Sequence, residues 1–301
     1  MTLDQLRIFV EVARCEHVTR AAARLNLTQS AVSAAITALE QRHDVLLFNR
    51  IGRGIELTAA GRRFVAAAEA VLSRATEAEG LLRDLTGGPS GSLHLAASQT
   101  VASYWLPSRL MAFHDAYPAV DLHLSAGNTE TVVRDVASGV VDLGVVEGAF
   151  SETEFEVISL ASDQMSVFVG PRHPWHAGGP GAAADLLGSS WILRERGSGT
   201  RSEFERHLAT LGMDPAALRV VLDLPSNEAC IAAAEAGAAA TVLSRRAIGA
   251  RPGGALREVD IALPARSFRA IRDPRRHPSR ATLALLSILQ KAPGLPDPAD
   301  P

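Results

Sequence analysis

Residues 18–50 contain two short helical patterns separated by a polar break, and this arrangement constrains the fold more than any other feature of the chain. In the first pattern, Ala21, Ala22 and Leu25 form an apolar face. Thr28 follows the break and is placed to cap the second helix, because its hydroxyl can accept a hydrogen bond from a free N–H of the first turn. The apolar face expected for the second helix comprises Ala31, Val32, Ala35, Ile36 and Leu39. The pattern predicts a helix-turn-helix.

The remaining side chains of the second helix are short and polar, which suits contact with base edges in a major groove. We expect a helix-turn-helix from about Val18 to Thr37 that binds DNA. The expected DNA-binding residues on this helix are Thr28, Gln29, Ser30, Ser33 and Thr37.

A wing is expected after the second helix, because Leu46-Leu47-Phe48 and Gly54-Ile55-Glu56-Leu57 resemble two short strands around a turn. Arg50 and Arg53 lie in or beside that turn, and we expect them to contact phosphates or the minor groove. An internal ion pair with Glu40 is the alternative role for Arg50.

Charge is distributed unevenly along the chain. Residues 1–63 contain nine Arg and six acidic residues, whereas the remainder contains 21 basic and 27 acidic residues. A basic N-terminal segment on an acidic body favours a phosphate-bearing partner at one end only.

The rest of the chain suggests several domains. We expect a DNA-binding domain over residues 1–58 and a long helix over residues 59–87, with an apolar stripe that packs on another subunit or, as the alternative, on the chain's own body. Gly87-Gly88-Pro89-Ser90-Gly91 is a linker pattern. Beyond it, strand and helix patterns alternate, as in an open, mostly parallel α/β sheet. The expected segments are one lobe over residues 91–161 and 266–292, a second lobe over 162–265, and a flexible tail over 293–301.

Small polar residues recur where the expected parallel strands end, which is where ligands bind in such sheets. Hydroxyls and amides beside helix N-termini favour a small anion, although each Ser or Thr could simply cap its helix. Glu147 disfavours an anion, and we expect it to pair with Arg194 or Arg201 or to hold a ligand hydroxyl or ammonium. The expected effector-binding residues are Ser98, Gln99, Thr100, Asn128, Thr129, Glu147, Arg194, Ser198, Gly199 and Thr200.

Catalytic and membrane signatures are absent from the sequence. It has no Walker loop, nucleophile elbow, zinc-protease motif or dinucleotide-binding glycine pattern, so neither an enzyme nor a bound cofactor or metal is expected. No apolar run of about 18 residues occurs, and no signal peptide precedes the first helix pattern, which predicts a cytoplasmic protein. The alternatives are an α/β enzyme and a solute-binding protein with an N-terminal helical domain.

Several blocks, in order, resemble the LysR family of transcriptional regulators. They are Ala22–Ser33 with its Thr28-Gln29 and Ala31-Val32-Ser33, then Leu39-Glu40, Leu47-Phe48-x-Arg50 and Leu57-Thr58-x-Ala60-Gly61. Two departures are Ala34, where many members carry Arg or Lys, and His43-Asp44, where Leu-Gly is usual. Gly127-Asn128-Thr129, Asp142–Gly148 and Arg194–Arg201 resemble the branch of Calvin-cycle and sulfur or sulfite regulators.

The resemblance implies an α+β winged helix-turn-helix, a long linker helix, and an α/β two-lobed effector domain of the periplasmic-binding-protein type. It also implies promoter DNA, RNA polymerase and a second copy of the chain as partners, with a homodimer or a dimer of dimers as the assembly. A small co-inducer between the lobes, an anion such as a sulfur oxyanion, is the implied switch.

Overall fold

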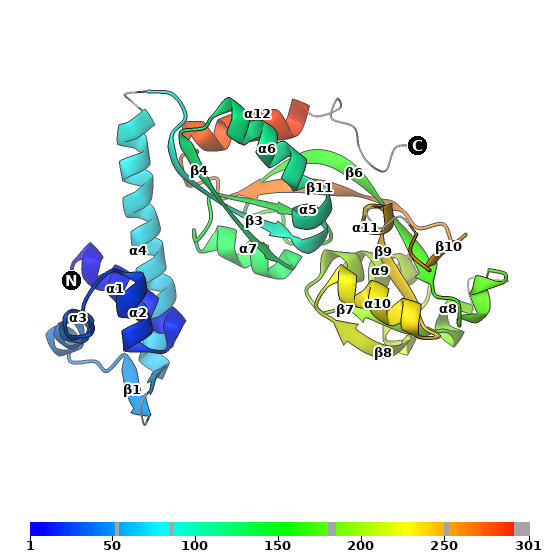
Figure 1. Ribbon diagram of the computed structural model, residues 1–301, viewed down its shortest axis with the longest axis horizontal. Helices are drawn as coiled ribbons and strands as arrows, with labels where there is room; N and C mark the ends of the chain where they lie inside the picture. The colour runs from blue at the N-terminus through cyan, green and yellow to red at the C-terminus, as the bar shows by residue number, and fades with distance from the viewer. Residues whose placement is uncertain (52–53, 85–86, 180–184, 250–252, 292–301) are drawn as a thin grey trace. The chain divides into compact units, whose positions relative to one another are not determined.

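The computed structural model describes residues 1–51, 54–84, 87–179, 185–249 and 253–291 (Figure 1). The chain divides into two units, which are described separately. One unit contains residues 1–86 together with Ser138–Val140, and the other contains the remaining residues from Gly87 onward.

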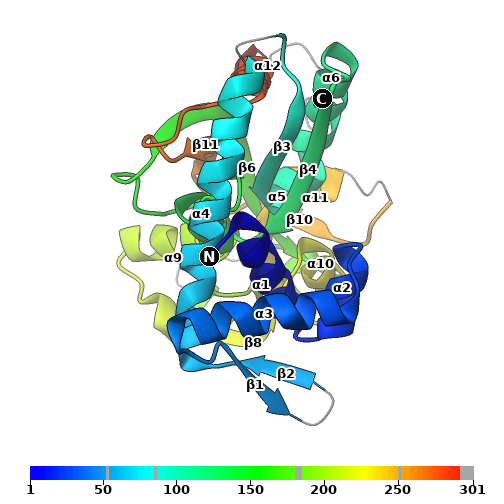
Figure 2. The ribbon, with the colours of Figure 1, turned by 90° about the vertical axis from the view of Figure 1, so that its left-hand side faces the viewer.

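The first unit is a winged helix-turn-helix followed by a long helix. Its elements are α1 (Leu3–Cys15), α2 (Val18–Arg24), α3 (Gln29–His43), β1 (Phe48–Ile51), β2 (Gly54–Leu57) and α4 (Ala59–Asp84). Strands β1 and β2 pair antiparallel with Phe48 opposite Leu57, and in Figure 2 this wing lies directly below α3. The expected wing is therefore confirmed, except that its first strand begins at Phe48.

Local signals explain where these helices begin and end. The hydroxyl of Thr2 accepts from the N–H of Gln5, and the Gln5 side chain accepts from the N–H of Thr2, which makes a capping box for α1. Thr28 caps α3, as expected, over 3.2 Å to the N–H of Ala31. Helix α3 ends at His43, and the next residue, Asp44, adopts the left-handed conformation with φ 50°.

The core of the first unit corrects two expectations. Ala31 is exposed, so the buried face of α3 consists of Val32, Ile36 and Leu39, with Ala35 partly buried. Phe64, Ala68 and Leu72 of α4 pack into the same core as Phe9 of α1, so this part of the α4 stripe is buried within the chain. Val71, next to Leu72, and Leu82, near the end of α4, are 43% and 67% exposed, so these apolar side chains remain available to another subunit.

The second unit is built on one sheet in the described part of the chain. Its strand order is β4-β3-β5-β11-β6-β9-β7-β8, with β10 paired to β6. The strands are β3 (Gly91–Ser98), β4 (Val120–Gly127), β5 (Leu143–Val146), β6 (Glu156–Val169), β7 (Ser190–Arg194), β8 (Arg219–Leu224), β9 (Ala240–Ser244), β10 (Arg257–Val259) and β11 (Ala265–Arg272).

Helices cover both faces of this sheet, as an α/β fold requires. They are α5 (Gln99–Tyr104), α6 (Leu106–Ala116), α7 (Thr129–Ala137), α8 (Asp185–Gly188), α9 (Gly199–Thr210), α10 (Asn227–Ala236), α11 (Arg245–Gly249) and α12 (Arg280–Lys291), with short 3₁₀ turns η1 (Pro174–His176) and η2 (Pro215–Ala217). In the β3–β5 half, α6 and α12 lie on one face and α7 on the other (Figure 1).

The long strand β6 connects the two halves of the sheet. Its residues 156–164 pair with β11, and its residues 165–169 pair with β9. We call the half containing β3, β4 and β5 the first lobe, and the half containing β7, β8 and β9 the second lobe. The expected α/β alternation is confirmed, but the strand expected at residues 165–169 is only the end of β6.

Candidate functional sites

The start of α3 presents polar side chains to solvent. Asn26, with φ 54°, adopts the left-handed conformation that turns the chain between α2 and α3. Thr28 and Ser30 are exposed, and their hydroxyls lie 3.0 Å apart. Gln29 is exposed at the first position of α3, so its amide is accessible to a macromolecule.

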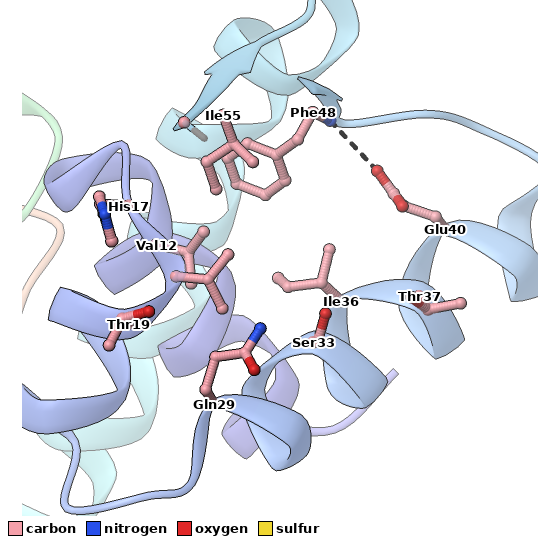
Figure 3. A pocket seen from close by; sticks show the side chains of 12 residues that line it. Val12, His17, Thr19, Gln29, Ser33, Ile36, Thr37, Glu40, Phe48 and Ile55 are labelled. Atoms are coloured by element: carbon pink, nitrogen blue, oxygen red, sulfur yellow. Dashed lines mark hydrogen bonds between the residues drawn. The ribbon is translucent and has the colours of Figure 1, made fainter. Parts of the chain in front are cut away.

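A hollow of about 240 Å³ lies between the start of α2, one face of α3 and the wing (Figure 3). Gln29, Ser33 and Thr37 lie four residues apart on α3, so they form one polar row along this hollow. The other lining residues are Val12, His17, Val18, Thr19, Ile36, Glu40, Phe48, Gly54 and Ile55. The expected row of short hydrogen-bonding side chains therefore lies on the concave surface of the first unit.

The wing arginines remain expectations. Arg50 belongs to β1, opposite Ile55, but its side chain lies outside the described residues, and so does all of Arg53. Glu40 has other partners, since its Oε1 accepts from the N–H groups of Leu47 and Phe48 at 2.7 and 3.1 Å.

In the second unit, Glu147 is the centre of the polar cluster at the strand ends. It directly follows β5 and is 2% exposed. Ser98 donates a hydrogen bond to its Oε2, and Thr129 donates to its backbone carbonyl over 2.6 Å. The hydroxyl of Ser98, expected to meet an anion, therefore already meets a carboxylate of the chain.

The charged partner of Glu147 is Arg266, which corrects the expected pairing with Arg194 or Arg201. Nη1 of Arg266 lies 3.7 Å from Oε1 of Glu147 and donates to the hydroxyl of Thr200 over 2.9 Å. Nε of Arg266 donates to Asp163 over 2.8 Å. Nη2 is buried and has no hydrogen-bond partner among the described residues. This is the donor that an added anion could use.

Burial raises the pKa of Glu147, and the nearby Asp163 carboxylate acts in the same direction. The charges of Arg266 and Arg194 and a hydrogen bond from Thr100 lower this pKa and offset part of the rise. The carboxyl of Glu147 is thus easier to protonate than a solvated one, which reduces its repulsion of an anion nearby.

Arg194 was expected to bind the effector or to pair with Glu147, but its guanidinium binds other residues of the chain. Its Nε and Nη2 bind the carboxylate of Glu195 at 2.8 and 3.0 Å, while Nη1 donates to Asn227 Oδ1 over 2.8 Å. Asn227 in turn donates to the hydroxyl of Thr100 over 3.2 Å. Arg194 therefore orients Asn227 and, through it, Thr100. Arg201 pairs with Glu205 and Asp223 instead.

Gln99 and Asn128 connect the lobes near the same cluster. Gln99 accepts from the N–H of Asn227 over 2.7 Å and donates to Glu228 over 2.8 Å. Glu228 also accepts from the hydroxyl of Tyr104 over 2.6 Å. Asn128 donates to Glu195 over 3.3 Å.

A backbone contact between the lobes explains the glycine at position 199. A Cβ atom there would lie 2.1 Å from the carbonyl oxygen of Glu147, so only glycine allows this approach. Gly148 faces it with φ 90°, a conformation that also favours glycine. Gly199 and the buried Ser198 thus begin α9 directly against the first lobe.

Simple helix capping does not account for two of the expected hydroxyl residues. Ser98 and Ser198 occupy N-cap positions, yet neither side chain makes a capping hydrogen bond. Asn128 does accept from the N–H of Thr131 over 2.9 Å, so it is a cap as well as a contact between lobes.

Sequence reasoning missed three members of the cluster, namely Arg266, Asp163 and Asn227. Asn227 follows strand β8 and begins α10, so the same strand-end rule could have found it. Arg266 and Asp163 lie within strands, and only the pairing of β6 with β11 brings them to the site.

Metal-binding clusters and membrane-spanning helices were sought among the residues that the structure describes. These residues contain no cluster of three or more His, Cys, Asp or Glu residues that could hold a metal ion. None of the helices described combines the length and apolar character that crossing a membrane requires.

Comparison with known proteins identifies both units. Residues 3–62 match the family described as bacterial regulatory helix-turn-helix protein, lysR family, and residues 86–293 match the LysR substrate binding domain. The chain is 35% identical over 299 residues to the regulator YeiE of Escherichia coli (strain K12), covering 97% of this chain and 98% of YeiE.

One further relative agrees, and a solved structure has the same fold. The RuBisCO operon transcriptional regulator of Allochromatium vinosum is 32% identical over 248 residues, covering 82% of this chain and 81% of the relative. The crystal structure of full-length CbnR complexed with its target DNA has a TM-score of 0.70 at 22% identity, covering 96% of this chain and 99% of CbnR, which supports the fold. The chain belongs to the LysR family: it is a DNA-binding transcriptional regulator with an effector-binding domain, and not an enzyme.

Proposed function

We propose that this regulator is switched by a small anion that binds between the lobes of the second unit, at Nη2 of Arg266. The observation that carries the proposal is this buried guanidinium N–H group without a hydrogen-bond partner in the described residues. A buried donor without an acceptor is costly, so an acceptor from a ligand is favoured there. Arg binds oxyanions well because its planar fork matches their geometry.

The surrounding residues restrict the ligand to a small one. Ser98, Thr100, Thr129 and Thr200 are all at most 2% exposed. Ser98 and Thr100 hydrogen-bond to the carboxylate of Glu147, and Thr129 donates to its backbone carbonyl. Thr200 of the second lobe accepts from Arg266, so hydroxyls of both lobes lie around this pair. A sulfur oxyanion, a phosphate or a short carboxylate fits a site of this chemistry, and a sulfur oxyanion is our first choice.

Glu147 supports a second candidate, a ligand with a hydroxyl or ammonium group. Its carboxylate is an acceptor at the centre of the cluster, and it would bind such a group directly. The two candidates differ in the residue that they need, since an anion requires Arg266 and a hydroxylated or cationic ligand requires Glu147.

At the other end of the chain, we propose that Gln29 and Ser33 contact base edges, that Thr28, Ser30 and Thr37 support them, and that Arg50 and Arg53 contact the DNA backbone or minor groove. The chain would act as a homodimer or a dimer of dimers on promoter DNA and would contact RNA polymerase. A ligand changes this activity only if it binds two arrangements of the protein with different affinity.

A melting experiment tests the effector proposal on the full chain. Sulfite, sulfate, phosphate and acetate, each at millimolar concentration, are added separately, and an anion that binds the folded state raises the melting temperature. The hydroxyl proton of Thr100 is directed at Glu147 in this structure. If the hydroxyl turns to donate to the bound anion instead, the substitution Thr100→Ala should weaken anion binding by about 1.5–3 kcal/mol. If no anion shifts the wild type but an amine or polyol does, the second candidate replaces the first.

A further inference from the structure

The segment Leu46–Phe48 joins the recognition helix α3 to the wing, and both edges of its backbone are held by side chains. Its N–H groups face Glu40 of α3, and its carbonyl groups face Thr58, which immediately precedes α4. Three elements therefore meet at this short segment: the recognition helix, the wing and the long helix.

On the first edge, one carboxylate oxygen makes both contacts. Oε1 of Glu40 accepts from the N–H of Leu47 over 2.7 Å and from the N–H of Phe48 over 3.1 Å, the contact drawn in Figure 3. Leu47 and Phe48 are 6% and 9% exposed, so these N–H groups have little access to water.

On the second edge, Thr58 binds the neighbouring carbonyl groups. Its hydroxyl donates to Leu46 over 2.8 Å, and its N–H donates to Leu47 over 2.9 Å. The same hydroxyl accepts from the N–H of Gly61 over 2.9 Å and so caps α4. A Cβ atom at Gly61 would lie 2.1 Å from the Leu47 carbonyl oxygen, which shows how closely α4 approaches the segment.

We infer that Glu40 is a positioning residue for DNA binding, which fixes the wing and the start of α4 relative to the recognition helix. Its hydrogen bonds set where the wing lies when Gln29 and Ser33 are in the major groove.

The charge of Glu40 supports this role. Glu40 lines the same hollow as Gln29, Ser33 and Thr37. A carboxylate on the surface that approaches DNA repels phosphates, so Glu40 weakens binding by its charge alone. Its benefit must therefore come from the two N–H groups that it accepts.

Three substitutions separate acceptor geometry from charge. Glu40→Gln keeps an oxygen at the same reach and removes the charge. Glu40→Asp keeps the charge, but its side chain is shorter by one methylene. Glu40→Ala removes both. The probe is a DNA duplex selected from a random pool by the wild-type protein, and each variant is compared by titration, hydroxyl-radical footprinting and thermal melting.

We expect Glu40→Gln to bind within about threefold of the wild type and to give the same footprint. Glu40→Asp and Glu40→Ala should bind about tenfold more weakly, since two hydrogen bonds to a charged acceptor are lost. Their footprints should lose the outer protections that the wing gives, while the central protections remain when the protein is saturating. A purely structural role would weaken all protections together and follow the melting temperature.

Two results would overturn the inference. One is a footprint of Glu40→Asp identical to that of the wild type. The other is a Glu40→Gln variant as impaired as Glu40→Asp, because the charge and not the acceptor would then matter. If Glu40→Ala does not fold, the comparison of the Gln and Asp variants still shows whether the acceptor or the charge of Glu40 matters.

Discussion

Arg266 lies directly opposite Asp163 in the pairing of β11 with β6, and its Nε donates to Oδ2 of Asp163 over 2.8 Å. Both side chains are at most 2% exposed. Asp163 also accepts from the hydroxyl of Ser244 over 2.6 Å, so its carboxylate is itself held in place. The pair lies on the strands that connect the two lobes. It fixes the guanidinium so that Nη1 reaches Thr200 of the second lobe.

This geometry predicts that Arg266→Lys abolishes most anion binding, although the charge is kept. A lysine has no planar fork and cannot bind Asp163, Thr200 and a ligand together. For an anion that binds the wild type, we expect the affinity of the variant to be lower by about tenfold or more, as measured by calorimetry on the full chain. Arg272→Lys is the matched control, because Arg272 lies on the same strand but pairs with Glu156. Equal affinities in wild type and Arg266→Lys would exclude Arg266 as the ligand donor.

Glu147 predicts that anion affinity depends on pH. Burial raises the pKa of its carboxyl, so lowering the pH neutralises it sooner than a solvated carboxyl. The neutral form does not repel an anion at Arg266, and binding should therefore strengthen as the pH falls and weaken as it rises. Sulfate is a suitable probe, because its own charge does not change over the range in which a carboxyl with a raised pKa takes up its proton.

The variant Glu147→Gln is neutral at every pH, so its sulfate affinity should change little over the same range. A pH profile that is equally steep in wild type and Glu147→Gln would assign the effect to another group.

Local patterns made the helix-turn-helix and the alternation of strands and helices along the chain predictable. The cap at Thr28 and the apolar positions at Val32, Ile36 and Leu39 act within one helix, so the sequence shows them directly. Strand ends were also predictable, because they follow from where each apolar run stops. The pairing of Asp163 with Arg266 depends on the register of two strands far apart in the chain, and no local pattern contains it.

The two errors in the first unit have a similar cause. Phe64 and Leu72 lie on a stripe that suits either another subunit or α1, and only tertiary packing shows that they join the α1 core. Ala31 lies at a helical spacing from Ala35 and was therefore expected on the buried face of α3, but the observed buried face does not extend to Ala31. Small residues tolerate exposure, so their spacing is weak evidence of burial.

His173 predicts that acid destabilises the second unit. It is 5% exposed; its Nδ1 accepts from the N–H of Trp175 over 3.1 Å, and its Nε2 lies 3.0 Å from the Ser189 hydroxyl. Burial lowers the pKa of His173 below 6.5, the ordinary value for a histidine. As the pH falls, the unfolded chain therefore takes up a proton at this histidine before the folded protein does. The contribution of His173 to the free energy of unfolding is fully present above about pH 6.5 and is lost as the pH falls towards the lower pKa of the folded state.

The substitution His173→Asn keeps an acceptor for the Trp175 N–H and removes the titrating group. Its melting temperature should fall less than that of the wild type between about pH 7.5 and about pH 5.5. An equal fall in both proteins would show that other groups cause the acid sensitivity.

We expect that replacing Asp44, directly after α3, stabilises the first unit. With φ 50° and ψ 43° it is left-handed, a conformation that costs most residues about 1–2 kcal/mol relative to glycine. Its negative charge also lies at the unfavourable end of the helix dipole. We expect Asp44→Gly to stabilise the first unit by about 1 kcal/mol after the entropic cost of glycine in the unfolded chain. Asp44→Asn removes the charge alone and should recover a smaller part, as measured by denaturant unfolding. No gain in either variant would contradict this account.

We expect Gln29 to contribute to the DNA sequence specificity of the recognition helix. Its amide is exposed at the start of α3 and can both donate to and accept from a base edge, as in the bidentate contact of glutamine with adenine. Gln29→Ala should weaken binding to a selected duplex by about 1–3 kcal/mol and leave binding to scrambled DNA nearly unchanged. Gln41→Ala is the matched control, because Gln41 is an exposed glutamine on the same helix that does not line the hollow. Gel-shift titrations of both variants on both duplexes give the four affinities needed. If Gln29→Ala lowers the two affinities equally, Gln29 positions the helix on the DNA backbone and does not read bases.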